Sequence, residues 1–190
     1  RFELRQMIGR SHASSAWLAF DPRLEIELVL CVPRALPGTN AERDAWTQDV
    51  LSGTRLKHPR LAEVIEIGVH EGWPFVACGR AGPTLQERVQ SGAPLTPNEV
   101  AQLSVDVLDG LAYAHEAGVA HRDLGLHSVT LDQNGRAQLV GLAVGLEQLA
   151  STQTSRPLRN RQEAREAAER DLLMVGLLMY RLLVNHPALD

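Results

Sequence analysis

Cysteine and aromatic residues are scarce in this sequence, and each shortage narrows the class of protein. Aromatic residues make up 4% of the 190 residues, so aliphatic side chains must fill the core. The two cysteines, Cys31 and Cys78, lie far apart in a chain without a secretory signal, which argues against a disulfide scaffold and for the reducing cytoplasm. We therefore expect two buried free thiols.

The chain also lacks a basic cluster and a long apolar run. Its formal net charge is −4 and its basic residues are scattered, which argues against binding of nucleic acid. The longest apolar run, residues 172–180, is followed by Arg181 and is too short for a membrane span. Because the sequence begins without methionine in a strand-like pattern, we expect a fragment of a longer protein, in which a membrane anchor elsewhere stays open.

What the sequence does contain is an ordered series of short apolar patterns. Apolar residues make up 44% of the chain and charged residues 22%, as in a soluble globular protein. Runs of apolar or alternating residues are separated by Ser, Gly, Pro and Asp, which is typical of strands. They predict strands at residues 1–9, 15–20, 26–32, 61–69 and 73–79.

Two helices are expected beside these strands. Residues 41–56 predict a helix with Trp46 and Val50 on one side, and Leu51 is a third candidate for that side. Residues 84–90 predict a short helical piece directly after the last strand. The first part of the chain is therefore expected to be a β-rich unit that contains one helix.

The strongest helical pattern starts at Thr96, which is suited to cap a helix whose first residue is Pro97. Glu99 lies in its first turn and Gly118 terminates it. One face of this helix collects the apolar residues Val100, Leu103, Val107, Leu111 and Ala114.

A small hairpin and a last helix complete the pattern. Residues 128–132 and 137–143 predict two strands around the turn-forming pair Asn134-Gly135. The segment from Asp171 to residue 183 is apolar nearly all round and is expected to be buried centrally. The polar stretch before it is expected to be mobile, or to extend the helix with its second half.

In this order of elements the chain resembles the eukaryotic-type protein kinase family, and especially its bacterial serine/threonine members. Residues 1–9 resemble the first kinase strand, 58–68 the passage from helix to strand, and 113–124 the approach to the catalytic loop. The resemblance implies an α+β, bilobal, protein kinase-like fold. Its β-rich N-lobe would contain five strands and one helix and would cover residues 1–80. Its helical C-lobe would cover residues 81–190 and would be truncated after the central buried helix.

The N-lobe departs from the family pattern where a kinase holds the phosphates of ATP. Of the three glycines in the phosphate-binding loop only Gly9 remains, with Ser11 and Ser14 at the two later positions. The resemblance places Cys31 where the kinase has its phosphate-binding lysine, and a neutral thiol cannot hold polyphosphate. Asp49 replaces the glutamate that orients this lysine, and we expect it to have no cation to meet.

The C-lobe departs from the pattern in its charged groups. Asp123 stands at the position of the kinase base, but Gly125 replaces a lysine. Ser128 and Gly141 replace the asparagine and aspartate that bind magnesium, so the resemblance implies neither bound ATP nor metal. Cys78 falls at the back of the nucleotide pocket, where its small side chain would leave space unless packing closes it.

Other residues are expected to have structural roles. By resemblance, His121 packs inside the lobe, Arg122 reaches toward the activation segment, and Asp171 braces the backbone of the catalytic loop. His115, His121 and His127 recur every six residues, but this spacing defines no shared face and suitable partner ligands are missing. We therefore expect no metal site.

These observations predict a catalytically inactive kinase-like domain, a pseudokinase, that acts as a protein-binding or allosteric module of a larger signalling protein. Its partner would be another protein or a neighbouring domain of the same polypeptide. The chain itself would lie in the cytoplasm, with the cytoplasmic part of a membrane-anchored protein as the alternative. Two alternatives stay open: a divergent serine/threonine kinase with weak ATP binding, and a scaffold that acts through the surface left by the missing helices, for example as a homodimer that covers the final helix.

Overall fold

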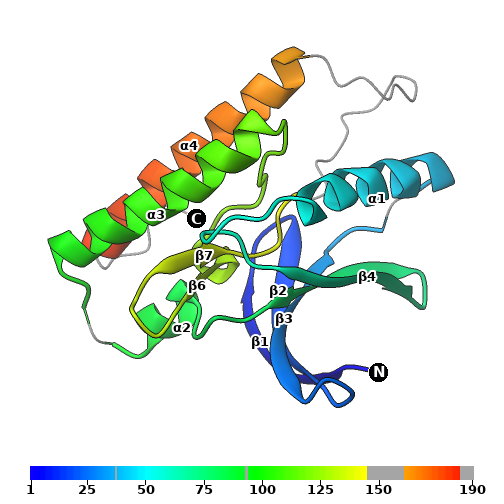
Figure 1. The fold of residues 1–190 in the computed structure, drawn as a ribbon, viewed down its shortest axis with the longest axis horizontal. Coiled ribbons are helices and arrows are strands. Elements are labelled where there is room, and N and C mark those ends of the chain that lie inside the picture. The colour runs from blue at the N-terminus through cyan, green and yellow to red at the C-terminus, as the bar shows by residue number, and fades with distance from the viewer. Residues whose placement is uncertain (37, 93, 145–160, 185–190) are drawn as a thin grey trace.

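A computed structural model describes residues 1–36, 38–92, 94–144 and 161–184, and has an α+β architecture (Figure 1). The N-terminal part contains β1 (Glu3–Arg10), β2 (Ser14–Asp21), β3 (Ile26–Pro33), α1 (Asn40–Thr54), β4 (Val64–His70) and β5 (Trp73–Gly79). The remainder contains α2 (Leu85–Gln90), α3 (Pro97–Glu116), the 3-10 turn η1 (Leu126–Ser128), β6 (Val129–Leu131), β7 (Ala137–Leu139) and α4 (Arg161–Val184).

The predicted α+β class and the order of its elements are confirmed. The five N-terminal strands form one antiparallel sheet with the strand order β1-β2-β3-β5-β4. The predicted division between residues 80 and 81 falls in the connection from β5 to α2. As a boundary between domains it stays a prediction.

Helix α1 lies beside the sheet and buries one side against it (Figure 1). Trp46 and Val50 are buried there, in a cluster with Val29 and Val76 of the central strands. The third candidate, Leu51, is 38% exposed and lies outside this cluster. One residue corresponds to about 100° of rotation around a helix, which turns Leu51 away from the side that Val50 shares with Trp46.

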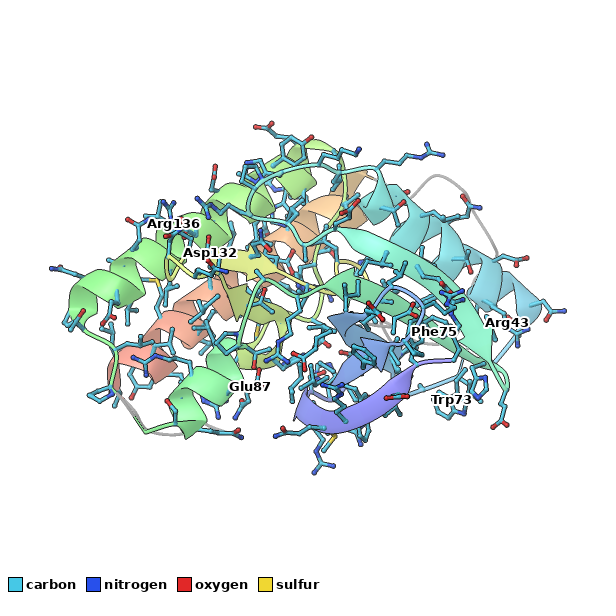
Figure 2. The ribbon with its side chains drawn as sticks, turned by 60° about the horizontal axis from the view of Figure 1, so that its bottom comes forward. Arg43, Trp73, Phe75, Glu87, Asp132 and Arg136 are labelled. Carbon is cyan, nitrogen blue, oxygen red and sulfur yellow. The ribbon has the colours of Figure 1, made fainter. Side chains whose placement is uncertain are left out.

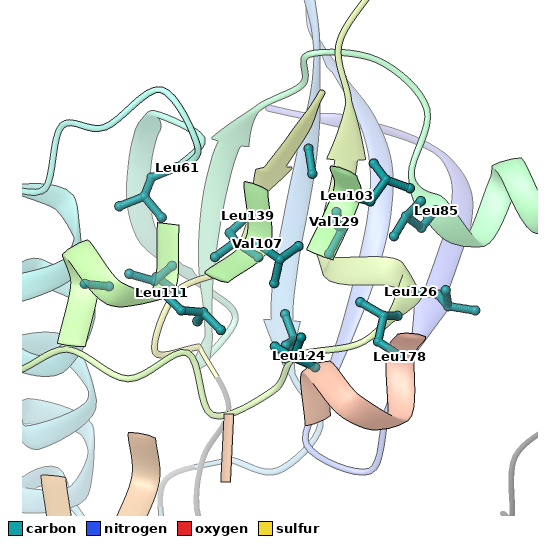
Figure 3. Close-up of a cluster of buried hydrophobic side chains, with 14 of the residues drawn as sticks. Leu61, Leu85, Leu103, Val107, Leu111, Leu124, Leu126, Val129, Leu139 and Leu178 are labelled. Atoms are coloured by element: carbon teal, nitrogen blue, oxygen red, sulfur yellow. The ribbon is translucent and has the colours of Figure 1, made fainter. Parts of the chain in front are cut away.

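Helix α3 begins as its sequence predicts. The Thr96 hydroxyl accepts a hydrogen bond from the backbone N–H of Glu99, and the Glu99 carboxylate accepts one from the backbone N–H of Thr96. The predicted apolar face is buried between α4 and the small hairpin (Figure 3). This core includes Leu103, Val107 and Leu111 of α3 with Val129, Leu139 and Leu178.

The hairpin of β6 and β7 has shorter strands than its sequence predicts. Its turn uses Gly135 with a φ of 72°, which glycine adopts without steric cost. Leu139 pairs on its other side with the segment before β4: its N–H donates to the Arg60 carbonyl (2.8 Å) and its carbonyl accepts from Ala62 N–H (2.8 Å). Strand β7 is thus hydrogen-bonded both to β6 and to the segment before β4.

A buried carboxylate joins the hairpin to α3. From the hairpin, Arg136 extends toward α3 (Figure 2), where its Nε donates to Asp106 Oδ2 at 2.8 Å. The Ala137 N–H donates to the same oxygen at 3.0 Å, and Arg60 Nε lies 3.6 Å from Oδ1. Asp106 is 1% exposed, so these partners replace the water that its charge has lost.

Helix α4 starts at Arg161, so the second half of the polar stretch does extend it; residues 151–160 lie outside the described residues. The expectation of a centrally buried helix is wrong for the described part of the chain, where α4 packs on α3 along one face only. Its other face exposes Leu172, Leu173, Met174, Leu177, Tyr180, Leu183 and Val184. None of the described helices is both long and apolar enough to cross a bilayer.

Candidate functional site

The loop of residues 118–128 is held in place by a carboxylate of α4. Asp171 Oδ2 accepts a hydrogen bond from the His121 N–H (2.7 Å), and Oδ1 accepts one from the Arg122 N–H (2.8 Å). His115 Nε2 also lies 2.8 Å from Oδ2. Burial by itself would raise the pKa of Asp171, but His115 and the two backbone N–H groups lower it, so the carboxylate is charged.

His121 packs inside the molecule and orients the loop from within. Its Nε2 donates to the Val140 carbonyl at 3.1 Å, which leaves Nδ1 to accept from the Asp123 N–H at 3.4 Å. Burial lowers the pKa of His121, so the ring is neutral at physiological pH. The loop backbone is thereby fixed on both sides of Arg122.

Asp123, at the position of the kinase base, already has partners in the structure. Its Oδ2 accepts a hydrogen bond from the Ser14 hydroxyl of β2, and His127 Nε2 lies 3.5 Å from the same oxygen. Burial would raise the pKa of Asp123, but His127 and Ser14 lower it to about 2. The carboxylate is therefore ionised and is covered by groups from the N-terminal sheet and from its own loop.

The β1–β2 hairpin approaches this loop closely. Gly9 lies against His127, and a Cβ atom at Gly9 would be 2.2 Å from the Cβ of His127. Within the hairpin, the Ser11 hydroxyl accepts from the N–H groups of Ala13 (2.9 Å) and Ser14 (3.0 Å). Ser11 therefore shapes the turn, while Ser14 reaches the loop, and His127 fills the space below Gly9.

The thiols lie together in the interior behind this contact. Cys31 on β3 and Cys78 on β5 are both buried and free, as predicted. The hydrogen bond with Cys78 and burial raise the pKa of Cys31 well above its ordinary value, so this thiol is neutral. Gly141 has a φ of 75° and a Cβ there would lie 3.0 Å from Cys31 Sγ, so Cys31 packs directly against Gly141.

Asp49 does meet a cation, contrary to the sequence-based expectation. Arg122 Nη1 donates to Asp49 Oδ2 at 3.0 Å, although 73 residues separate them. Arg122 thus reaches α1, whereas the resemblance had directed it toward the activation segment. Its φ of 69° costs a non-glycine residue on the order of 1 kcal/mol. Trp46 Nε1 donates to the Val144 carbonyl (3.1 Å), so two contacts dock α1 on the helical part.

The positions compared with magnesium ligands do not fit a metal ion. The Ser128 hydroxyl is engaged with the backbone of Gly125, accepting from its N–H (2.9 Å) and donating to its carbonyl (3.1 Å). Gly141 has no side chain to offer. Among the described residues, no three His, Cys, Asp or Glu side chains gather as a metal site would require.

The ion pair between α1 and the loop is expected to contribute to stability. In a double-mutant cycle of Asp49→Ala and Arg122→Ala, we expect a coupling free energy of about 1 kcal/mol because the pair is partly buried. Urea unfolding of the four proteins measures it. The exposed pair Arg165–Glu169 of α4 is the control and should couple much more weakly; purely additive losses at Asp49 and Arg122 would contradict this prediction.

Several contacts of the site were missed by reasoning from the sequence. His127 was considered only as a metal ligand, and its contact with Gly9 was not foreseen. The contacts of His115 with Asp171 and of Ser14 with Asp123 were not predicted either. These pairs join distant segments, and no local spacing signals them. The loss of cationic and metal-binding groups, by contrast, could be read residue by residue.

No protein-family model matches the chain. The chain is similar to curated proteins, among them a probable serine/threonine-protein kinase of Streptomyces coelicolor, with 27% identity over 205 residues that cover 98% of this chain and 30% of that protein. The serine/threonine-protein kinase PrkC of Bacillus subtilis is 22% identical over 202 residues, which cover 100% of this chain and 31% of that protein.

The serine/threonine-protein kinase PknB of Mycolicibacterium smegmatis is 24% identical over 209 residues, covering 98% of this chain and 33% of that protein. The chain therefore spans about a third of the length of these relatives.

Proposed function

Because the chain is homologous over its whole length to bacterial serine/threonine protein kinases, we propose that it is a kinase-like domain that has lost phosphotransfer. In this proposal it serves as a protein-binding or allosteric regulatory module of a larger signalling protein in the cytoplasm. Its partner is another protein or a neighbouring domain of the same polypeptide. It binds neither ATP nor magnesium.

The observation that carries this proposal is the missing countercharge at the positions that the resemblance compares with the nucleotide and metal site of a kinase. A triphosphate with its divalent ions needs cations and anionic oxygen ligands around it. At the compared positions the chain has Cys31, whose raised pKa keeps it neutral, and Ser128 and Gly141, which offer no carboxylate. Asp123 is retained but is bonded to Ser14.

The exposed face of α4 supports a role in binding protein. Seven large apolar side chains on the described part of this helix are at least 38% exposed. Contiguous apolar surface on a soluble protein commonly marks a contact with another protein segment. A neighbouring domain fits this requirement, and so does a second copy of the chain.

A second candidate is a divergent serine/threonine kinase with weak ATP binding. The names of the relatives favour it, since all those described above are kinases. Asp123 is also retained at the position compared with the kinase base, and its lowered pKa keeps the carboxylate ionised, so it can accept a hydrogen bond from a hydroxyl group. The two candidates differ in whether the purified chain transfers phosphate.

Phosphotransfer is therefore the decisive measurement. The purified chain, incubated with labelled ATP and Mg²⁺ or Mn²⁺ and a generic protein substrate, is expected to transfer no more phosphate than Asp123→Asn does. Millimolar ATP with magnesium is expected to leave its melting temperature unchanged, because only a ligand that binds the native state raises it. Transfer by the wild type that disappears in Asp123→Asn would establish the second candidate.

A further inference from the structure

We infer that Ser14 and His127 form a latch that holds the β1–β2 hairpin closed on the loop of residues 118–128. The latch covers the carboxylate of Asp123. It extends the proposed function, and it rests on that function only for its consequence, the exclusion of phosphate groups. The contacts themselves belong to the fold.

The first half of the latch is the hydrogen bond from the Ser14 hydroxyl to Asp123. Ser14 and Asp123 are 5% and 7% exposed, and 109 residues separate them along the chain. A hydrogen bond to an ionised carboxylate is stronger than one between neutral groups, and a buried carboxylate that loses its partner is costly. Opening the hairpin would break this charge-assisted hydrogen bond and leave Asp123 to water.

The second half is the contact of His127 with Gly9. The imidazole is 7% exposed and its Cβ lies directly under the one remaining glycine of the loop. His127 thereby fills the space between Gly9 and Asp123. Its Nε2 has no hydrogen-bond partner among the described residues and faces Asp123 Oδ2 at 3.5 Å.

The hairpin is built to present Ser14 in this position. Ser11 accepts hydrogen bonds from the backbone N–H groups of Ala13 and Ser14, which holds the backbone of the turn in the shape that places Ser14 beside Asp123. Beneath the hairpin, Ile8 and Ala16 share a buried cluster with Cys31 and Cys78. Raising the hairpin would therefore expose these thiols together with Asp123, and a ligand or partner that binds the raised hairpin would stabilise this open form.

Thiol alkylation measures this opening directly. The native protein is treated with iodoacetamide, and the labelling rates of Cys31 and Cys78 are followed by peptide mass spectrometry. Because loss of a hydrogen bond to a charged group favours opening, we expect Ser14→Ala to accelerate labelling at least about tenfold. His127→Ala is expected to accelerate it as well, and the double variant more than either.

Two matched controls separate the latch from general effects. Ser52→Ala removes an exposed serine of α1, and His70→Ala an exposed histidine at the end of β4; both should label at the wild-type rate. Urea unfolding of every variant measures its loss of global stability. From this loss follows the factor by which global unfolding alone would increase the rate of thiol labelling. Labelling of Ser14→Ala and His127→Ala that rises no further than this factor would overturn the latch.

The latch and the proposed function can fail separately. Phosphotransfer by the wild-type chain would defeat the proposed function while leaving the labelling result as it stands. Unchanged labelling in the two latch variants would defeat the latch, while absence of phosphotransfer would still support a catalytically inactive domain.

Discussion

Replacing Asp171 with alanine is expected to lower the free energy of unfolding by about 3–5 kcal/mol, because it leaves buried donors without their charged acceptor. The carboxylate is 1% exposed and accepts the N–H groups of His121 and Arg122, with His115 beside it. Its loss frees the loop that carries Asp123. Urea unfolding at pH 7, followed by circular dichroism, measures the difference.

Two comparisons test the cause of this loss. Asp171→Asn keeps an acceptor oxygen and should recover part of the stability, whereas Asp44→Ala on the exposed side of α1 should change little.

The folded-state pKa of Asp171 is lowered, so its contribution to stability is complete above the ordinary aspartate pKa of 3.8 and is lost as the pH falls through the lowered value. The deficit of Asp171→Ala should therefore narrow in acid, and a deficit independent of pH would contradict this account.

Replacing Asp106 with alanine is expected to cost about 3 kcal/mol of unfolding free energy, since a buried carboxylate is lost that accepts hydrogen bonds from Arg136 and the Ala137 N–H and pairs with Arg60. Arg136 and Ala137 would lose their partner at the hairpin, and Arg60 would lose its partner before β4. The hairpin and the helical core would separate more easily. Thermal and urea unfolding of the variant measure the cost.

The neighbouring Asp109 supplies the control for this prediction. It lies on the same helix, its side chain is 59% exposed, and its contact with His58 is 3.7 Å long. Asp109→Ala should therefore change the unfolding free energy by a small fraction of the Asp106 effect. If the two variants lose similar stability, the buried charge does not carry the connection between α3 and the hairpin.

Three contacts of the site join β2 and α1 to the later part of the chain. Arg122 binds Asp49, Trp46 binds the Val144 carbonyl, and Ser14 binds Asp123. Side chains from these distant segments therefore bind one another directly. A domain closed in this way is suited to present a fixed surface to a partner, which agrees with the proposed regulatory role.

The elements could be predicted because their signals are local. The cap formed by Thr96 and Glu99 lies within four residues, and the turn at Asn134-Gly135 within two. The apolar face of α3 repeats with the period of a helix and is buried as expected. Such patterns need no knowledge of the rest of the chain.

The failures have a different origin. Helix α4 was expected to be buried on all sides because its residues are apolar, but the described part of the molecule covers one face only. Asp49 was expected to lack a cation because the lysine of the kinase pattern is absent, yet Arg122 from a distant loop pairs with Asp49. In both cases the residue types were interpreted correctly, but the segment that lies beside them in the fold was predicted wrongly.

The sequence by itself determined which elements form and in which order, because propensity and capping act within a few residues, and its resemblance to the kinase pattern indicated which charged groups are missing. The tertiary structure alone decided where the remaining polar groups go: Ser14 to Asp123, Arg122 to Asp49, and His127 against Gly9. Buried polar groups must find partners, and the partner each one meets depends on how distant segments are brought together when the sheet folds onto the helical part.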